Sequence, residues 1–253
     1  MRQSSVVALS RRTTTPRSLR LVLPQNSAWR GLERNGNRPQ PSTIEYYRYL
    51  NQLAQREFGD THSARLLLKS IDYAPIMRCY GNDWARVLRL FEPELAELFA
   101  MRPDCVVVCC NTLHRAIDEL SDRWPAHIPI IHIVDETARV ALDRGYSRVL
   151  LLGTQFTMEN GYYAGRLQSA GLEVEIPALG DRQHIQSIQS AIAAGKEPGD
   201  APEYFRSLAA RHSHCDAAVL ACTELPMATD ARTSPLPLLD PLTIQCDAAF
   251  RFA

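Results

Sequence analysis

Residues 106–114 read VVVCCNTLH and residues 218–226 read AVLACTELP. Each stretch is an apolar run that ends in a cysteine and continues into polar residues. Such a run predicts a buried β-strand, and the polar residues after it predict a turn where a helix begins. A thiol at this position lies near free backbone N–H groups and the positive end of a helix dipole, which favour the thiolate. We therefore expect Cys110 and Cys222 to form a pair of acid/base groups that face each other across a cleft.

Similar apolar runs recur along the chain and alternate with helical patterns. Short runs rich in Val, Leu and Ile, without strict polar alternation, are typical of parallel strands that helices cover on both faces. Strands are expected at 19–23, 64–71, 105–110, 128–133, 148–153, 171–176 and 217–222, and helices at 43–58, 83–101, 113–124, 135–144, 158–170, 182–194 and 202–212. This alternation predicts an α/β fold with mostly parallel sheets flanked by helices.

The two cysteine motifs also predict two pseudo-symmetric lobes, because their separation is close to half of the 253-residue chain. We expect residues 41–114 and 225–253 to form the first lobe and residues 115–224 to form the second. Residues 1–40 read as an atypical leader, either disordered or a degenerate first strand. The first 32 residues contain six arginines and no acid, a composition that also resembles an organelle transit peptide, which is the less favoured alternative.

Composition excludes several classes of function. The 28 Lys and Arg residues balance the 28 Asp and Glu residues, so no basic field indicates nucleic acid or an anionic membrane surface. No apolar run reaches the roughly 18–20 residues that a membrane span needs. The seven cysteines are an odd number without a secretory signal, which indicates free thiols in a reducing, cytoplasmic compartment.

Several segments together resemble the aspartate/glutamate racemase family. The likeness covers roughly residues 42–247 and is most specific at the two motifs that begin at Cys110 and Cys222. It extends to the stretches STIEYY (42–47), HSAR (62–65), PIIHIVDETA (129–138) and LGTQFTM (152–158).

The resemblance implies an amino-acid racemase that needs neither pyridoxal phosphate nor any other cofactor. It implies that Cys110 and Cys222 exchange protons with opposite faces of the α-carbon of aspartate or glutamate, one as thiolate and the other as thiol. It also implies a homodimer and a small-molecule amino-acid substrate. The residues expected to bind that substrate are Thr43, Asn111, Thr112, Thr154, Thr223 and Glu224.

Other interpretations remain open. Related enzymes with this fold include hydantoin racemases, maleate isomerases and arylmalonate decarboxylases. The stretch before Ser42 lacks the Gly-Gly loop of the family, which favours a non-catalytic protein that binds acidic ligands. Cys110 and His114 have the i, i+4 spacing of a metal-ligand pair, but no second pair accompanies them, so no metal site is expected. The remaining cysteines, Cys215 among them, are expected to be buried core residues.

Overall fold

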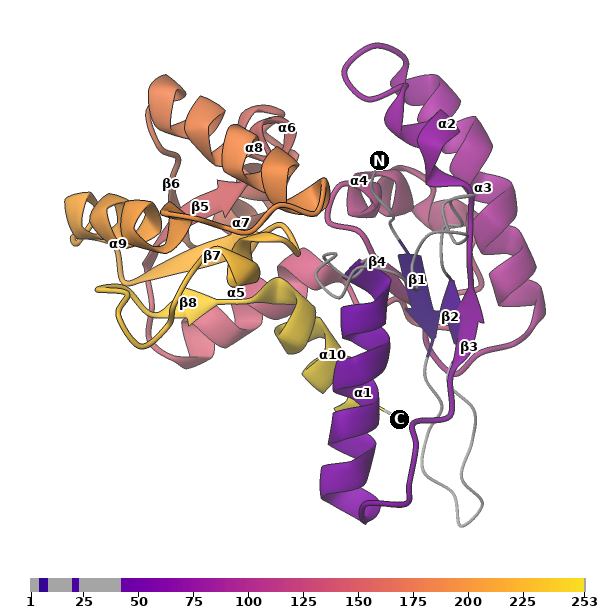
Figure 1. Ribbon diagram of the computed structural model, residues 1–253. Helices are drawn as coiled ribbons and strands as arrows, with labels where there is room; N and C mark the ends of the chain where they lie inside the picture. The colour runs from indigo at the N-terminus through magenta and orange to yellow at the C-terminus, as the bar shows by residue number, and fades with distance from the viewer. Residues whose placement is uncertain (1–4, 9–19, 23–41, 253) are drawn as a thin grey trace. The chain divides into compact units, whose positions relative to one another are not determined.

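The computed structural model describes residues 5–8, 20–22 and 42–252 (Figure 1). The chain divides into two compact units. The first contains the described residues up to His132 and the C-terminal segment from Gln245, and the second is Ile133–Ile244. Each unit has its own sheet and its own hydrophobic core, so the expected α/β class is correct.

The first unit is built around a four-stranded sheet with the order β2-β3-β1-β4. Its strands and helices are β1 (Ser5–Ala8), β2 (Arg20–Val22), α1 (Ser42–Phe58), β3 (Leu67–Lys69), α2 (Tyr73–Met77), α3 (Trp84–Ala100), β4 (Val107–Cys109) and α4 (Leu113–Glu119). One face of β4 packs into a core with α2, α3 and α4. Helix α1 also lies against β4.

Strand β1 is the exception among the expected mostly parallel strands. This strand runs antiparallel to both of its neighbours, β3 and β4. Of the expected leader, the structure describes only β1 and β2, both as strands; the rest of residues 1–40, including the segment without the Gly-Gly loop, lies outside the described residues.

The second unit is built around a fully parallel sheet with the order β6-β5-β7-β8. Its elements are α5 (Ile133–Asp143), β5 (Arg148–Gly153), α6 (Gln155–Glu159), α7 (Tyr162–Ser169), β6 (Glu173–Glu175), α8 (Leu179–Ala193), α9 (Ala201–Arg211), β7 (Ala217–Ala221) and β8 (Leu238–Leu239). Helix α10 (Pro241–Phe252) crosses the boundary between the units.

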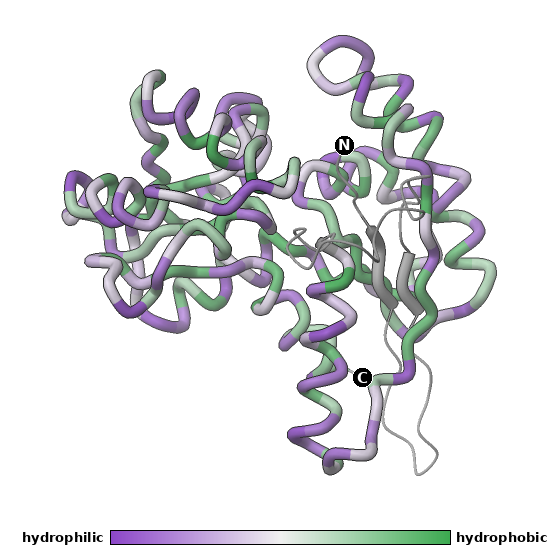
Figure 2. Tube along the Cα trace, viewed as in Figure 1, coloured by the Kyte–Doolittle hydropathy of each residue, from purple (hydrophilic) through white to green (hydrophobic). Residues whose placement is uncertain are grey.

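Alternate residues of the central strands enter different cores, as the two-residue period of a strand requires. Leu150 and Leu220 pack with α8 and α9 on one face, whereas Val149 and Val219 pack with α5 and α7 on the other. Figure 2 shows helices such as α1 alternating between hydrophilic and hydrophobic residues, as helices with one buried side do. Because both faces are covered, β5 and β7 are almost continuously apolar.

Two further expectations need correction. Residues 128–133 form no strand: Val106 and Ile130 make a single parallel bridge, and Ile133 already begins α5. The expected lobe boundaries at 114/115 and 224/225 also differ from the observed units. Helix α4 stays in the first unit because Leu113 and Ile117 pack into its core, and residues up to Ile244 stay in the second because β8 pairs with β7.

Candidate functional site

Cys110 lies immediately after β4 and before α4, where the sequence predicts it. The residue is buried, with 9% of its surface exposed. Its sulfur lies 3.5 Å from the hydroxyl of Tyr73, the first residue of α2. The Tyr73 hydroxyl in turn donates to that of Tyr80, at 2.7 Å. The candidate thiol of the first unit therefore faces a pair of phenols.

The Tyr80 hydroxyl keeps its proton. Burial raises the pKa of Tyr80 well above its ordinary value, and the neighbouring Tyr73 and Cys110 raise it further. A neutral phenol can donate a hydrogen bond to a thiolate, and such a bond favours the charged form of the sulfur. The sequence pattern around Cys110 did not indicate these tyrosines, because both lie at least 30 residues earlier in the chain.

A buried hydrogen-bond chain fixes the backbone of Cys110. His114 Nδ1 lies 2.9 Å from the Cys110 carbonyl oxygen, so this nitrogen must be the N–H donor. His114 Nε2 then accepts from Gln245 Nε2 at 3.3 Å, and Gln245 also donates to the Ile131 carbonyl. The Tyr46 hydroxyl completes the chain by donating to Gln245 Oε1 at 2.7 Å. His114 is thus positioned to hold the turn in place, with its Nδ1 used by the backbone.

The other candidate residues of the first unit have different surroundings. Asn111 is buried, and among the described residues its Oδ1 accepts no hydrogen bond. Thr112 precedes α4 without capping it through its side chain. Thr43 is buried near the start of α1, with 1% of its surface exposed. A buried acceptor without a donor is uncommon, so Asn111 is the clearest candidate of the three for a ligand contact.

Cys222 follows β7 in the second unit and is buried, with 8% of its surface exposed. Its sulfur donates to Glu224 Oε2 at 2.9 Å. The Thr223 hydroxyl donates to the same oxygen at 3.1 Å. The structure therefore brings together three residues that the sequence singles out, Cys222, Thr223 and Glu224.

Thr154 lies at the end of the neighbouring strand β5. Its hydroxyl accepts from the backbone N–H of Thr157 at 3.1 Å and so caps α6. Gly153, the last residue of β5, pairs with Ala221 at the end of β7. The two strand ends that carry Thr154 and Cys222 are therefore adjacent at the carboxyl ends of the parallel strands. Ligands of such sheets usually bind there.

Comparisons with known proteins find related sequences and structures. A family model described as Asp/Glu/hydantoin racemase matches residues 37–249. The chain is 28% identical over 141 residues to the broad specificity amino-acid racemase RacX of Bacillus subtilis (strain 168). That match covers 54% of this chain and 59% of the relative. A glutamate racemase from a Nitratiruptor species is 30% identical over 158 residues, covering 60% of this chain and 59% of the relative.

The chain thus matches about three-fifths of the length of these curated relatives. Among solved structures, a candidate Asp/Glu racemase from Yersinia pestis is similar with a TM-score of 0.76 and 30% identity. That similarity covers 83% of this chain and 93% of the other. No helix in the part of the chain that the structure describes is both long and apolar enough to cross a membrane.

Proposed function

Since the chain belongs to the Asp/Glu/hydantoin racemase family, we propose that it interconverts the enantiomers of aspartate or glutamate by proton transfer between two thiols and the α-carbon. One observation carries the proposal. In each compact unit, a buried strand is followed directly by a buried cysteine beside a polar partner: Cys110 beside Tyr73, and Cys222 beside Glu224.

The proposed mechanism uses the two thiols in opposite protonation states. The Cys110 thiolate removes the α-proton from one face of the substrate and becomes a thiol. The Cys222 thiol gives its proton to the opposite face and becomes a thiolate. The product is the other enantiomer, and the reverse reaction restores both groups. General acid–base catalysis of this kind contributes roughly 10²–10⁴-fold to rate.

Asn111 supports the proposal as a substrate-binding residue. Its buried Oδ1 is an acceptor only, so it suits the N–H groups of a substrate ammonium. The substrate carboxylate would bind the hydroxyl and backbone N–H groups of Thr112 and Thr223, where the developing negative charge needs stabilisation. Thr43 and Thr154 remain proposed substrate contacts; the observed use of Thr154 is the cap of α6.

The experiment is α-proton exchange in deuterated water, followed by NMR, with each enantiomer of aspartate and glutamate and no added cofactor. We expect exchange with loss of optical purity for at least one of the two amino acids. Cys110→Ala and Cys222→Ala should each abolish racemisation. Cys109→Ala is the matched control, because Cys109 is also buried but belongs to β4 itself.

Two results would count against the proposal. If either cysteine variant racemises the substrate as fast as the wild type, the two-thiol mechanism is wrong. If the folded wild type binds acidic amino acids without any exchange, the chain is a binding protein with this fold.

Two further properties belong to the proposal. A cytoplasmic location rests on the absence of disulfides among the seven cysteines, all of which are free. A homodimer rests on the family resemblance. Light scattering of the purified chain measures the second property directly, and a monomeric mass over the assay range would contradict it.

A further inference from the structure

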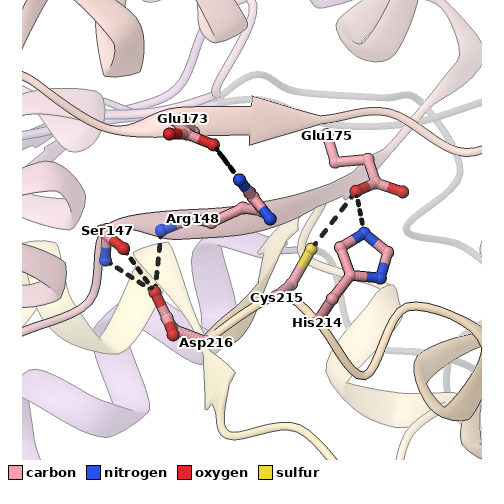
Figure 3. A network of polar contacts seen from close by, with 7 residues as sticks. All are labelled: Ser147, Arg148, Glu173, Glu175, His214, Cys215 and Asp216. Atoms are coloured by element: carbon pink, nitrogen blue, oxygen red, sulfur yellow. Dashed lines mark hydrogen bonds and ion pairs between the residues drawn. The ribbon is translucent and has the colours of Figure 1, made fainter.

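A cluster of metal-ligand side chains lies in the second unit, away from the cysteine site. His212, His214 and Cys215 lie on the segment between α9 and β7, and Glu175 is the last residue of β6. Figure 3 shows His214 and Cys215 directed at the Glu175 carboxylate. His214 Nε2 lies 2.5 Å from Glu175 Oε2, and the Cys215 sulfur lies 3.6 Å from the same oxygen. His212 Nδ1 binds the other carboxylate oxygen at 2.5 Å.

The cluster is separate from the proposed active site. Cys215 precedes β7, whereas Cys222 follows it, so the two cysteines lie at opposite ends of the same strand. Seven residues of extended chain span about 23 Å at roughly 3.3 Å per residue. The cluster therefore shares no residue with the proposed substrate site at Cys222.

The donor atoms are arranged closely enough for one metal ion. One atom each from Glu175, His214 and Cys215 lie within 4.8 Å of one another, and these three form the one such group among the described residues. In a tetrahedral zinc site with bonds of about 2.0–2.3 Å, neighbouring ligand atoms are about 3.5 Å apart. Small side-chain rotations would bring the three atoms to that spacing. His214 is half-exposed, so an ion can reach the cluster from solvent.

The chemistry of the donors favours zinc over the alkaline-earth ions. Magnesium and calcium prefer oxygen ligands alone, whereas a set of one imidazole, one thiolate and one carboxylate is typical of zinc. The charges also balance, because Zn²⁺ would neutralise the Glu175 carboxylate and a Cys215 thiolate. Arg148 lies beside the cluster, but its guanidinium is paired with Glu173, as Figure 3 shows.

We propose that Glu175, His214 and Cys215 bind a Zn²⁺ ion, with water as the fourth ligand and His212 orienting the carboxylate. On binding, the Cys215 thiol releases its proton to solvent and its sulfur bonds to the metal. The proton of the neutral His214 imidazole moves from Nε2 to Nδ1, and Nε2 then binds the metal ion. A histidine that holds a ligating carboxylate acts like other outer-sphere partners of metal sites, which fix the ligand in its binding orientation. The ion would link β6 to the segment before β7 and so stabilise the second unit.

The test is a zinc titration of the chelator-treated full chain against a chromophoric chelator, followed by cobalt substitution. We expect one Zn²⁺ per chain, a rise in the melting temperature with added zinc, and a cobalt–thiolate charge-transfer band. His214→Ala and Cys215→Ser should each weaken zinc binding by about 100-fold or more, and Cys215→Ser should also remove the cobalt band. His212→Ala should weaken binding by about 10–100-fold.

Two control variants separate site binding from adventitious binding. His184→Ala removes another exposed histidine of the same unit, and Cys79→Ser changes a buried thiol whose hydrogen bond to the Pro75 carbonyl a hydroxyl can keep. Both should bind zinc as the wild type does. His214→Ala changes a half-exposed side chain, so it should remain folded by circular dichroism. Zinc binding that is absent, or equal in the wild type, His214→Ala and Cys215→Ser, would overturn the proposal, and none of these assays requires racemase activity.

Discussion

The sulfur of Cys222 lies 2.9 Å from Glu224 Oε2 and donates its proton to that carboxylate. The corresponding sulfur of the first unit, in Cys110, instead lies 3.5 Å from a phenol hydroxyl, that of Tyr73. A carboxylate can only accept a hydrogen bond, whereas a phenol hydroxyl can donate one or accept one. The two candidate thiols therefore have different polar partners, a carboxylate at Cys222 and a phenol at Cys110.

The first prediction concerns this carboxylate. In Glu224→Gln the amide oxygen still accepts a hydrogen bond, but the negative charge that holds the proton on Cys222 is gone. Cys222 should then be alkylated by iodoacetamide about tenfold faster, which corresponds to about 1.4 kcal/mol. Time-resolved peptide mass spectrometry measures the rate, and Cys110 in the same samples is the internal control. An unchanged or slower rate at Cys222 would mean that Glu224 does not hold the proton.

The second prediction concerns Tyr73. Tyr73→Phe removes the hydroxyl that contacts Cys110 and that donates to Tyr80. The loss of the hydrogen bond to Tyr80 should lower the free energy of unfolding by about 1 kcal/mol, and α-proton exchange should slow because Cys110 and Tyr80 both lose the hydroxyl that they contact. Urea denaturation and the exchange assay measure the two effects. Tyr47→Phe is the control, because its ring is half-exposed on α1, and it should change neither quantity.

The third prediction concerns the buried chain behind Cys110. Tyr46→Phe leaves Gln245 Oε1 without its donor in a fully buried place, which should cost about 1–3 kcal/mol of stability. Tyr49→Phe removes a longer, partly buried bond of 3.2 Å to Asp247 and should cost less. Urea denaturation measures the free energy of unfolding of both variants. An equal loss of stability in the two would show that the Gln245 network contributes no more than the partly buried bond of Tyr49.

The fourth prediction concerns acid stability. Burial works to raise the pKa of Asp181, but hydrogen bonds from Tyr204 and Arg211 outweigh it and lower the pKa below its ordinary value of 3.8. A carboxylate with a lowered folded-state pKa stabilises the fold above the unfolded-state value, and this contribution disappears as the pH falls through the folded-state value. The free energy of unfolding of the wild type should therefore decrease as the pH is lowered below about 4.

Asp181→Asn isolates this effect, because an amide does not titrate. The wild type should be the more stable of the two at neutral pH, and the difference should shrink as the pH falls below about 4. Urea denaturation at a series of pH values measures the difference. A difference that stays constant over this range would contradict the lowered pKa of Asp181.

The sequence predicted the parts of the structure that depend on local pattern. The strands that end at Cys109, Gly153 and Ala221 are continuous apolar runs, and both faces of each are buried. Strand β8 was missed because it has only two residues and is defined by its pairing with β7. Residues 128–133 have the composition of a strand, but only one bridge forms before α5 begins. The local sequence predicts which residues are buried, but it does not predict which strand a short segment pairs with.

The same distinction holds for the sites. Cys110 and Cys222 became candidates because each follows its own strand, and Glu224 because it is two residues from Cys222. Tyr73, in contrast, is brought to Cys110 only by the fold. Cys215 is buried as expected, yet it contacts Glu175, which is 40 residues away. The one available signal was the close spacing of His212, His214 and Cys215, three metal-ligand residues within four positions.

The fifth prediction concerns the carboxyl ends of β5 and β7, next to Cys222. A methyl group on Gly153 would lie 3.2 Å from the Ala221 carbonyl oxygen and 3.2 Å from Thr157 Cβ, which is closer than ordinary van der Waals contact. Gly153→Ala should therefore displace the end of β7, cost about 1–3 kcal/mol and slow α-proton exchange. The control is Gly165→Ala in α7, where a methyl group meets nothing within 4 Å and should stabilise the helix by about 0.5–1 kcal/mol. If Gly153→Ala keeps wild-type stability and exchange rate, the close approach of β5 and β7 does not position Cys222.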